Sequence, residues 1–111
     1  MPFYSQNEID TRSEKTLFPG VATRTWWGEQ MLISRVVLAP NAEAPLHQHV
    51  NEQAGIVISG ALQMEVDGET RTLLPGEIYL APSNVPHRAV AGPDGCGGVE
   101  CFSPLREPLM Y

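Results

Sequence analysis

The residues of this chain that are best suited to chemistry are three histidines and a glutamine. His47 and His49 stand two residues apart in the β-favouring segment PNAEAPLHQHVNEQAGIVISG, which covers residues 40–60. Side chains alternate between the two faces of a strand, so these two imidazoles share a face. If the chain stays extended, Gln53 lies on that face as well, whereas Glu52 points away. The pattern therefore predicts two imidazoles and one amide directed at the same point.

The third histidine, His87, follows Pro86 in a second β-favouring segment. Three imidazoles and one amide oxygen are neutral ligands, so they would leave a divalent ion with most of its charge and make it a strong Lewis acid. Imidazole binds several transition metals, and the residues predict a divalent metal ion (Ni, Zn, Fe, Co or Mn) without selecting one. The alternative is that these histidines are ordinary core or surface residues, because H-x-H alone is not a specific pattern.

Short β-favouring segments separated by turns make up most of the chain that must position these ligands. Residues 21–27 and 31–39 predict a β-hairpin around Gly28-Glu29. The other strong turn and loop signals are Ser59-Gly60, Asp67-Gly68, Pro75-Gly76 and the segment 92–98. No segment of useful length shows the helical period, so the sequence predicts an all-β antiparallel sandwich or barrel.

The length of 111 residues predicts one domain with a sizeable hydrophobic core. Residues 1–16 are polar and show no sustained period, so we expect an N-terminal arm or a short edge element there. Residues 17–111 are expected to form the single domain. Trp26 and Trp27 must take opposite faces of their strand, and we expect at least one of them in the core.

Composition and charge exclude several classes of partner. Seven Lys and Arg against thirteen Asp and Glu give a net charge of −6, which would repel a phosphate backbone, so we expect no nucleic-acid partner. No apolar run approaches the roughly 20 residues of a membrane span. The N-terminus lacks a secretory signal, so we expect a cytoplasmic protein with no membrane partner.

Cys96 and Cys101 lack C-x-x-C spacing, which predicts free thiols. Apolar residues within 104–111 could pack on the body of the domain or on a second copy of the chain, and we expect a homodimer.

The spacing of the ligand residues resembles that of a known superfamily. The pattern H-x-H-x3-Q-x6-G runs from His47 to Gly60, and a Pro-Gly-Glu turn at 75–77 precedes a P-x3-P-H pattern that ends at His87. Together these resemble the two motifs of the cupin superfamily. The resemblance implies a cupin double-stranded β-helix, which is a jelly-roll sandwich or barrel.

Two further features make the resemblance narrower. Most cupins carry glutamate where this chain has Gln53, and the segment 100–107 reads ECFSPLRE. These look like the small single-domain cupins of the KdgF family, which linearise unsaturated uronates in pectin and alginate breakdown. The similarity covers about residues 20–111. It implies that the metal ligands are His47, His49, Gln53 and His87.

A second group of residues near the C-terminus consists of Glu100, Phe102 and Arg106. Glu100 and Phe102 share a face of their strand, and Arg106 follows closely enough to reach a substrate carboxylate. From the residues alone, the simpler interpretation is that Glu100 and Arg106 form a rim salt bridge while Phe102 fills the core. The resemblance implies instead that the three residues are the catalytic group, with Glu100 where the family more usually has Asp. Tyr79 either supplies a hydroxyl to the cavity or packs as an ordinary strand aromatic.

The resemblance implies a metal-dependent ring opening of 4,5-unsaturated monouronates to linear 4-deoxy-5-keto uronates. Glu100 would act as the base and then as the acid, and the expected ligand is a small-molecule sugar acid. Two alternatives remain open. One is an iron-dependent cupin dioxygenase, and the other is a non-catalytic, metal-containing cupin that binds a sugar acid.

Overall fold

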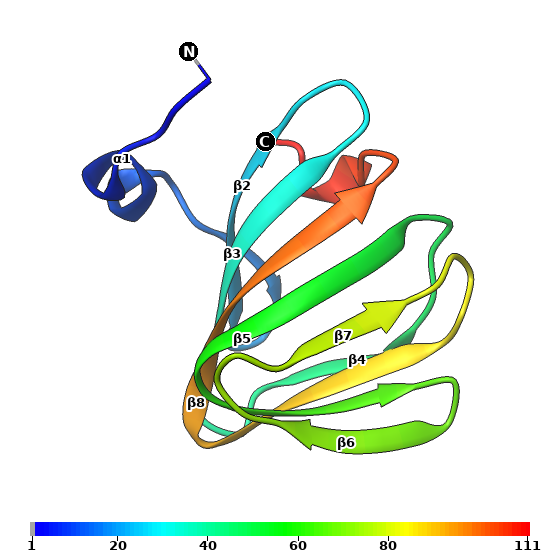
Figure 1. Cartoon of the computed structure of the whole chain (residues 1–111). Helices are drawn as coiled ribbons and strands as arrows, with labels where there is room; N and C mark the ends of the chain where they lie inside the picture. The colour runs from blue at the N-terminus through cyan, green and yellow to red at the C-terminus, as the bar shows by residue number, and fades with distance from the viewer. Residues whose placement is uncertain (1) are drawn as a thin grey trace.

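The structure is a computed structural model that describes residues 2–111, most of them in β-strands (Figure 1). In chain order the elements are α1 (Gln6–Thr11), β1 (Lys15–Phe18), β2 (Val21–Trp27), β3 (Leu32–Leu38), β4 (Glu43–His47), β5 (Glu52–Val66), β6 (Glu69–Leu73), β7 (Ile78–Ala81), β8 (His87–Ser103) and the 3₁₀ helix η1 (Glu107–Leu109). Within the described residues, neither helix has the length and hydrophobicity needed to cross a membrane.

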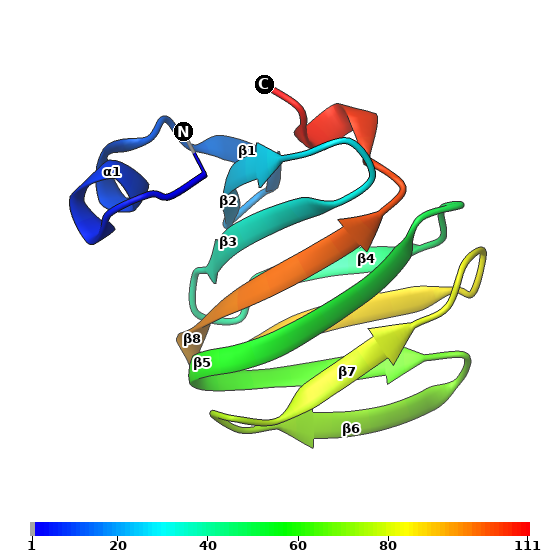
Figure 2. The ribbon, with the colours of Figure 1, turned by 45° about the horizontal axis from the view of Figure 1, so that its top comes forward.

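Two sheets face each other, and the long strands β5 and β8 take part in both (Figure 1 and Figure 2). The first sheet has the order β1-β2-β3-β8-β5-β7, in which residues 52–60 of β5 pair with residues 96–103 of β8. The second has the order β4-β8-β5-β6, in which residues 62–66 of β5 pair with residues 87–91 of β8. All of these pairs are antiparallel, which confirms the predicted all-β jelly roll.

The bend between the sheets differs from the sequence prediction. Ser59-Gly60 was expected to form a hairpin turn, but both residues lie inside β5, where the strand bends and its pairing register with β8 shifts. Gly60 has a φ of 73°, and a Cβ there would lie 2.1 Å from the carbonyl oxygen of Gly95 on β8. The predicted loop at 92–98 also lies inside a strand, because β8 bends with its neighbour. Turn-forming residues mark a β-bulge here and not a chain reversal.

Two predicted hairpins are confirmed. Strands β2 and β3 pair in register over their full length. At the other confirmed turn, Asp67 and Gly68 join β5 to β6 with φ values of 50° and 82°. Positive φ at both central residues is the requirement of a type I′ turn, which matches the twist of the strands on either side.

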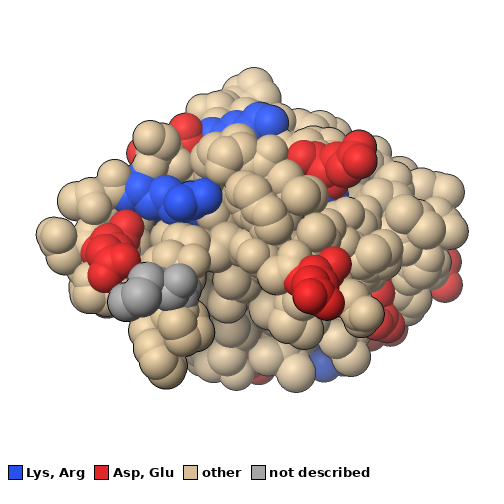
Figure 3. Space-filling model, turned by 90° about the horizontal axis from the view of Figure 1, so that it is seen from above, with Lys and Arg blue, Asp and Glu red and all other residues tan. Residues whose placement is uncertain are grey.

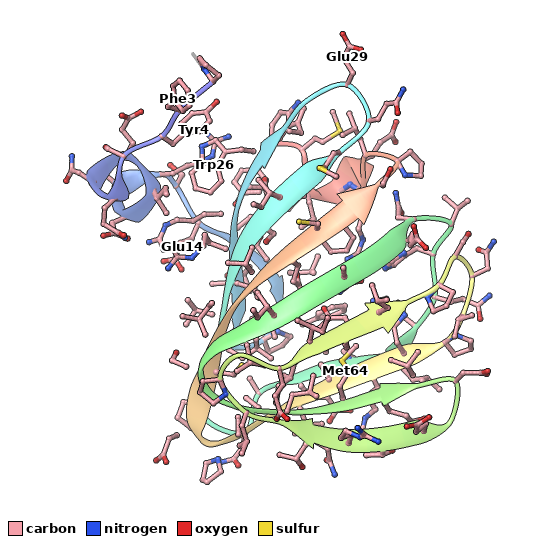
Figure 4. The ribbon with its side chains drawn as sticks, viewed as in Figure 1. Phe3, Tyr4, Glu14, Trp26, Glu29 and Met64 are labelled. Atoms are coloured by element: carbon pink, nitrogen blue, oxygen red, sulfur yellow. The ribbon has the colours of Figure 1, made fainter. Side chains whose placement is uncertain are left out.

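The interior between the sheets is apolar. The largest cluster of buried residues comprises Val21, Val36, Leu38, Val57, Leu62, Met64, Leu73, Ala91 and Cys96. Met64 is labelled in Figure 4. A smaller cluster of Leu32, Phe102 and Leu109 ties β3 and β8 to η1. Full burial of such a side chain stabilises the fold by about 1.5–3 kcal/mol, so both clusters help to hold the sheets and η1 in place.

The polar N-terminal segment contains a short helix. In α1, Ser5 accepts a hydrogen bond from the Glu8 N–H at 3.1 Å, and the Glu8 side chain accepts one from the Ser5 N–H at 3.4 Å. This capping box satisfies N–H groups that a helix start would otherwise leave free. The helix buries no residue, so its sequence has no apolar period that would have revealed it. Strand β1 then pairs with β2, and the predicted arm boundary at residue 16 falls inside β1.

The two tryptophans correct a prediction, because neither is a core residue. Trp26 is half-buried beneath the N-terminal segment, with its ring centroid 5.6 Å from that of Tyr4 and 5.2 Å from the Arg12 guanidinium carbon (Figure 4). Trp27 is 39% exposed. The sequence pattern placed a tryptophan in the core because it could not show that the N-terminal segment folds back and covers one of them.

Charged side chains on the surface are mixed in sign. Figure 3 shows acidic groups scattered among uncharged ones on one face, with the basic groups in separate small areas. The ion pairs include Arg88 with Glu43 at 2.7 Å and Arg24 with Glu14 at 3.6 Å. Exposed pairs of this kind contribute about 0–1 kcal/mol each, so the sheets and not the surface charges determine the fold.

Candidate active site

Three histidines meet where β4 ends and β8 begins. His47, the last residue of β4, pairs directly with His87, the first residue of β8, and His49 follows two residues after His47. The ring centroids of His47 and His87 lie 4.4 Å apart, and those of His49 and His87 lie 4.9 Å apart. One nitrogen from each ring lies within 4.8 Å of the others. The fold therefore brings together imidazoles that lie 40 residues apart in the chain.

Gln53 reaches the same place by a route that the sequence did not predict. The chain does not stay extended through Asn51, because β4 ends at His47 and β5 begins at Glu52, in the other sheet. The Asn51 side-chain amide donates to the carbonyl oxygens of Pro104 at 2.6 Å and of the next residue at 3.1 Å, which anchors the crossing. His47 and Gln53 thus approach each other from facing sheets.

Local backbone contacts orient the three imidazoles. The Nδ1 atoms of His47, His49 and His87 lie 2.6, 2.9 and 3.0 Å from the carbonyl oxygens of Pro45, Asn51 and Val85, each two residues away in the chain. A carbonyl only accepts, so each Nδ1 carries the proton and each neutral ring presents a lone pair at Nε2. The His87 Nε2 is buried and has no hydrogen-bond partner among residues 2–111. Three such lone pairs form a donor set that fits a divalent metal.

The amide of Gln53 is oriented by its own hydrogen bonds. Its nitrogen donates to the Tyr79 hydroxyl at 2.7 Å and to a carboxylate oxygen of Glu100 at 3.2 Å. Its oxygen, Oε1, therefore faces His49, 3.1 Å from Nε2. With the Nδ1 proton assigned as above, two acceptors point at each other, and a cation between them would turn this repulsion into ligation. The four residues together fit a metal ion.

Burial keeps two of the imidazoles in the neutral form that metals bind. It is the main cause that lowers the pKa of His49, and the positive charge of Arg106 adds to it. Burial also lowers the pKa of His87, although the hydrogen bond to Val85 acts in the opposite direction. A lowered pKa means that protons compete less with a metal for Nε2 near neutral pH.

Glu100 places a carboxylate beside this ligand set. It lies on β8 and accepts hydrogen bonds from the Tyr79 hydroxyl at 3.1 Å and from Gln53 at 3.2 Å. Burial raises the pKa of Glu100, whereas the Tyr79 bond, the charge of Arg106 and the Gln53 bond act against that rise. Among the ion pairs of residues 2–111, none joins Glu100 to Arg106, so the rim salt bridge does not form. A carboxyl with a raised pKa is suited to taking up and returning a proton.

Phe102 and Arg106 lie next to the histidines. Phe102 is 1% exposed, and its ring centroid lies 5.9 Å from that of His49. The Arg106 guanidinium carbon lies 5.2 Å from the centroid of the Phe102 ring. Burial lowers the pKa of Arg106, with the charge of Glu100 acting against it. Phe102 therefore fills the core and also supports the guanidinium of Arg106.

Tyr79 is the site residue whose place the sequence left open. Its hydroxyl bonds both Gln53 and Glu100, so it is not simply a packed strand aromatic. Burial, followed by the charge of Glu100, raises the pKa of Tyr79 well above its usual range, which keeps the phenol protonated and able to donate. The available signal was Gly55, an isolated glycine inside a strand, which often marks a close approach of another group.

A cavity between the sheets joins these groups. Its empty volume, including its opening to solvent, is about 640 Å³. The polar and charged residues that line it are His47, Gln53, Tyr79, His87, Glu100 and Arg106. Almost all of the other lining residues are apolar. A small ligand bound there would meet a carboxylate, a guanidinium and three of the four candidate metal ligands, His47, Gln53 and His87, inside an otherwise apolar pocket.

The fold and this arrangement are those of a known class of proteins. Residues 34–94, more than half of the 111 residues, match the cupin domain. The chain therefore belongs to the cupin family.

Comparison with individual proteins narrows this class. The pectin degradation protein KdgF of Dickeya dadantii (strain 3937) is 30% identical over 85 residues, which are 76% of this chain and 77% of that protein. The solved structure of KdgF from Halomonas sp. has a TM-score of 0.88 and 28% identity, and the match covers 99% of both chains. An H2HPP isomerase of Bacillus subtilis is 43% identical over 61 residues, which are 54% of this chain and 25% of the isomerase. Within the cupins the chain is KdgF-like, and its relatives support an enzyme of the cupin class.

Proposed function

We propose that this cupin opens the ring of a 4,5-unsaturated monouronate and yields the linear 4-deoxy-5-keto uronate. The observation that carries the proposal is the half-buried carboxylate of Glu100, which is linked through the Gln53 amide to the three converging histidines. The name of the Dickeya relative, a pectin degradation protein, supports a sugar acid as the substrate. The H2HPP isomerase, named as an isomerase, supports a reaction that rearranges bonds within one molecule.

The proposed metal ligands are Nε2 of His47, His49 and His87 and Oε1 of Gln53. When bound, a divalent ion supplies Lewis acidity that orients substrate oxygens and stabilises negative charge on them. The histidines contribute their orientation, because their Nδ1–H bonds to backbone carbonyls direct Nε2 inward. Outer hydrogen bonds of this kind also make imidazole a better ligand.

Glu100 carries the proton transfers in this proposal. As a base it removes the proton of the anomeric hydroxyl at C1, so that a C1 carbonyl forms and the bond between C1 and the ring oxygen breaks. The electron pair stays on the ring oxygen and gives the enolate of C4 and C5. The protonated Glu100 then returns its proton to C4, which leaves a ketone at C5. Burial raises the pKa of Glu100, which favours a carboxyl that can hold the proton between the two steps.

Arg106 would bind the acid end of the substrate, and Phe102 would support its guanidinium. A guanidinium presents a planar pair of donors that matches a carboxylate. The Phe102 ring beneath it limits the positions that the guanidinium can take. The substrate carboxylate would also compensate the partly buried charge of Arg106, because the described residues provide no ion pair for it.

The test is the decay of the ultraviolet absorbance of an unsaturated monouronate, measured with metal-loaded protein against a no-protein control, since the ring also opens spontaneously. We expect Glu100→Gln to lower turnover by about 10²–10⁴-fold while the protein still binds the metal, because the amide cannot exchange the proton. Full activity of this variant would exclude Glu100 as the acid and base. Activity only in the presence of oxygen and iron would instead indicate the dioxygenase, and ligand binding without decay would indicate a binding protein.

We also propose that the chain forms a homodimer through the outer face of the first sheet. Ile33, Cys101, Ala54 and Leu80 lie in register across β3, β8, β5 and β7. Ile33 and Leu80 are 44% and 65% exposed, and an exposed apolar row of this kind is a frequent contact surface between chains. Light scattering after size exclusion would show twice the chain mass. A mass of a single chain would contradict the dimer. The cytoplasmic location stays a prediction.

A further inference from the structure

The hydroxyl of Tyr79 connects two groups that have different roles in the proposed reaction. It lies 2.7 Å from the Gln53 amide nitrogen and 3.1 Å from a carboxylate oxygen of Glu100. An amide N–H donates and a carboxylate accepts, so the phenol oxygen accepts from Gln53 and the phenol O–H donates to Glu100. The hydrogen bonds have one consistent direction, from the metal-binding amide to the carboxylate.

Space for this contact is provided by Gly55. Gly55 pairs with Tyr79 on β7 and with Glu100 on β8, so these three residues form one row across three neighbouring strands. A Cβ at position 55 would lie 2.3 Å from Cε1 and 2.7 Å from the hydroxyl oxygen of Tyr79. The ring of Tyr79 therefore lies across Gly55 and reaches over one strand to Glu100. Glycine is needed here for space, because the positive-φ glycines of the described chain do not include Gly55.

The two N–H groups of the Gln53 amide are both used within this row. One donates to Tyr79 and the other to Glu100, which turns Oε1 toward His49. Without the hydroxyl, one N–H would lose its acceptor and the amide could rotate, so that its oxygen would no longer be fixed toward the histidines. Glu100 would lose one of its two donors at the same time and could take other rotamers.

We propose that Tyr79 is a positioning residue that orients the metal ligand Gln53 and the carboxylate of Glu100 together, and that Gly55 is glycine so that it can do so. The role given to Glu100 rests on the proposed function. The role given to Gln53 does not, because it concerns the affinity for a metal and needs no substrate. Tyr79 itself touches neither metal nor substrate in this proposal.

The first test is Tyr79→Phe, which removes the hydroxyl and keeps the ring. The metal-free protein is titrated with Co²⁺, and the visible absorption of the bound ion reports both the affinity and the ligand geometry. We expect the affinity to fall by about tenfold or more, as for other groups that orient a ligand, and the spectrum to change. The matched control is Tyr111→Phe, whose hydroxyl donates to the carbonyl oxygen of Thr23 and has no partner in the cavity. The control should keep the wild-type affinity and spectrum.

The same two variants are then assayed at saturating metal with the unsaturated uronate. We expect Tyr79→Phe to lower kcat by about tenfold or more with little change in KM, because the misplaced carboxylate affects the proton transfer more than binding.

If Co²⁺ binding by Tyr79→Phe equals that of the control, the part of the proposal that concerns Gln53 is overturned. An unchanged kcat overturns the part that concerns Glu100. If the wild type itself does not accelerate decay, the proposed function fails, whereas the Co²⁺ titration still decides the role of Tyr79.

Gly55→Ala tests the spatial argument. The added methyl group displaces the Tyr79 ring, so we expect the Co²⁺ affinity to fall to about the level of Tyr79→Phe. In a Tyr79→Ala background the methyl group meets no ring, and Gly55→Ala should then cause no further loss. A further loss of similar size in that background would mean that Gly55 acts on the site independently of Tyr79. Circular dichroism and thermal melting verify that each variant is folded before its affinity is compared.

Discussion

The two halves of the candidate site are held in place in different ways. Each imidazole is oriented by a carbonyl only two residues away in the chain. The carboxylate of Glu100 is oriented by Tyr79 and Gln53, which lie 21 and 47 residues away. The histidines therefore depend on the backbone beside them, whereas Glu100 depends on the correct pairing of three strands. We infer that the histidines are the more robust half and the carboxylate the more easily disturbed half.

This difference suits the two tasks that we propose. A metal ligand must present a lone pair in a fixed direction, and a short local hydrogen bond achieves this at low entropic cost. A group that takes up and returns a proton needs an environment that adjusts its pKa, and such an environment requires burial among several elements of the fold. Gln53 belongs to both halves, because its oxygen faces the histidines and its nitrogen contacts Glu100.

The largest effect is expected from His87→Ala, which removes a ligand from the robust half. The metal then loses one of its four proposed protein ligands, so we expect binding to become too weak to detect by titration and activity to fall to the rate of the no-protein control. Metal present at 100 times its dissociation constant should stabilise the wild type by about 2.7 kcal/mol. The thermal midpoint of the wild type should therefore rise with added metal and that of His87→Ala should not. A similar rise in both proteins would exclude His87 as a ligand.

The sequence predicted the histidines better than the surroundings of Glu100, because the histidines depend on contacts that are local in the chain. The H-x-H spacing and the Pro-His step near His87 are local patterns, and they identified residues that the fold brings together. The argument for Gln53 nevertheless assumed an extended chain through Asn51, whereas the chain bends there and crosses to the other sheet. Alternation along a single strand cannot anticipate a crossing that is anchored by a side chain to carbonyls more than 50 residues away.

The catalytic interpretation of Glu100, Phe102 and Arg106 came only from the family resemblance. From the residues alone, a rim salt bridge between Glu100 and Arg106 was the simpler interpretation. The contact that fixes Glu100 depends on which residues stand opposite Gly55 in β7 and β8, and this register is a property of the assembled sheet. For the same reason the bend at Ser59-Gly60 was taken for a turn, because the pairing that continues through it comes from β8.

An intermediate effect is expected from Glu100→Asp, which shortens the carboxylate side chain by one methylene. The hydrogen bonds from Tyr79 and Gln53 now span 3.1 and 3.2 Å, so a carboxylate withdrawn by about a bond length would lose at least one of them. We expect kcat to fall by about 10- to 100-fold, because misplacement by 1 Å is costly for proton transfer. Co²⁺ affinity should stay within a few-fold of the wild type, since the histidines keep their local contacts and the Tyr79 hydroxyl still accepts from Gln53. The variant shows whether the two halves can be disturbed separately, and an equal loss of affinity would contradict that separation.

The smallest effect concerns the stability of the metal-free protein between about pH 7 and pH 5.5. Burial lowers the pKa of His49 and His87 from 6.5, so the unfolded chain binds more protons than the folded chain as the pH falls through this range. The free energy of unfolding must then decrease on acidification. The raised pKa of Glu100 acts with the opposite sign, because its folded form holds a proton more tightly than the unfolded chain, and Glu100→Gln removes this contribution.

Urea unfolding should therefore compare Glu100→Gln with Glu100→Gln/His87→Ala. We expect the decline with falling pH to be shallower in the double variant. Equal slopes would mean that His87 does not titrate differently in the folded and unfolded chains, and that its burial does not keep it neutral.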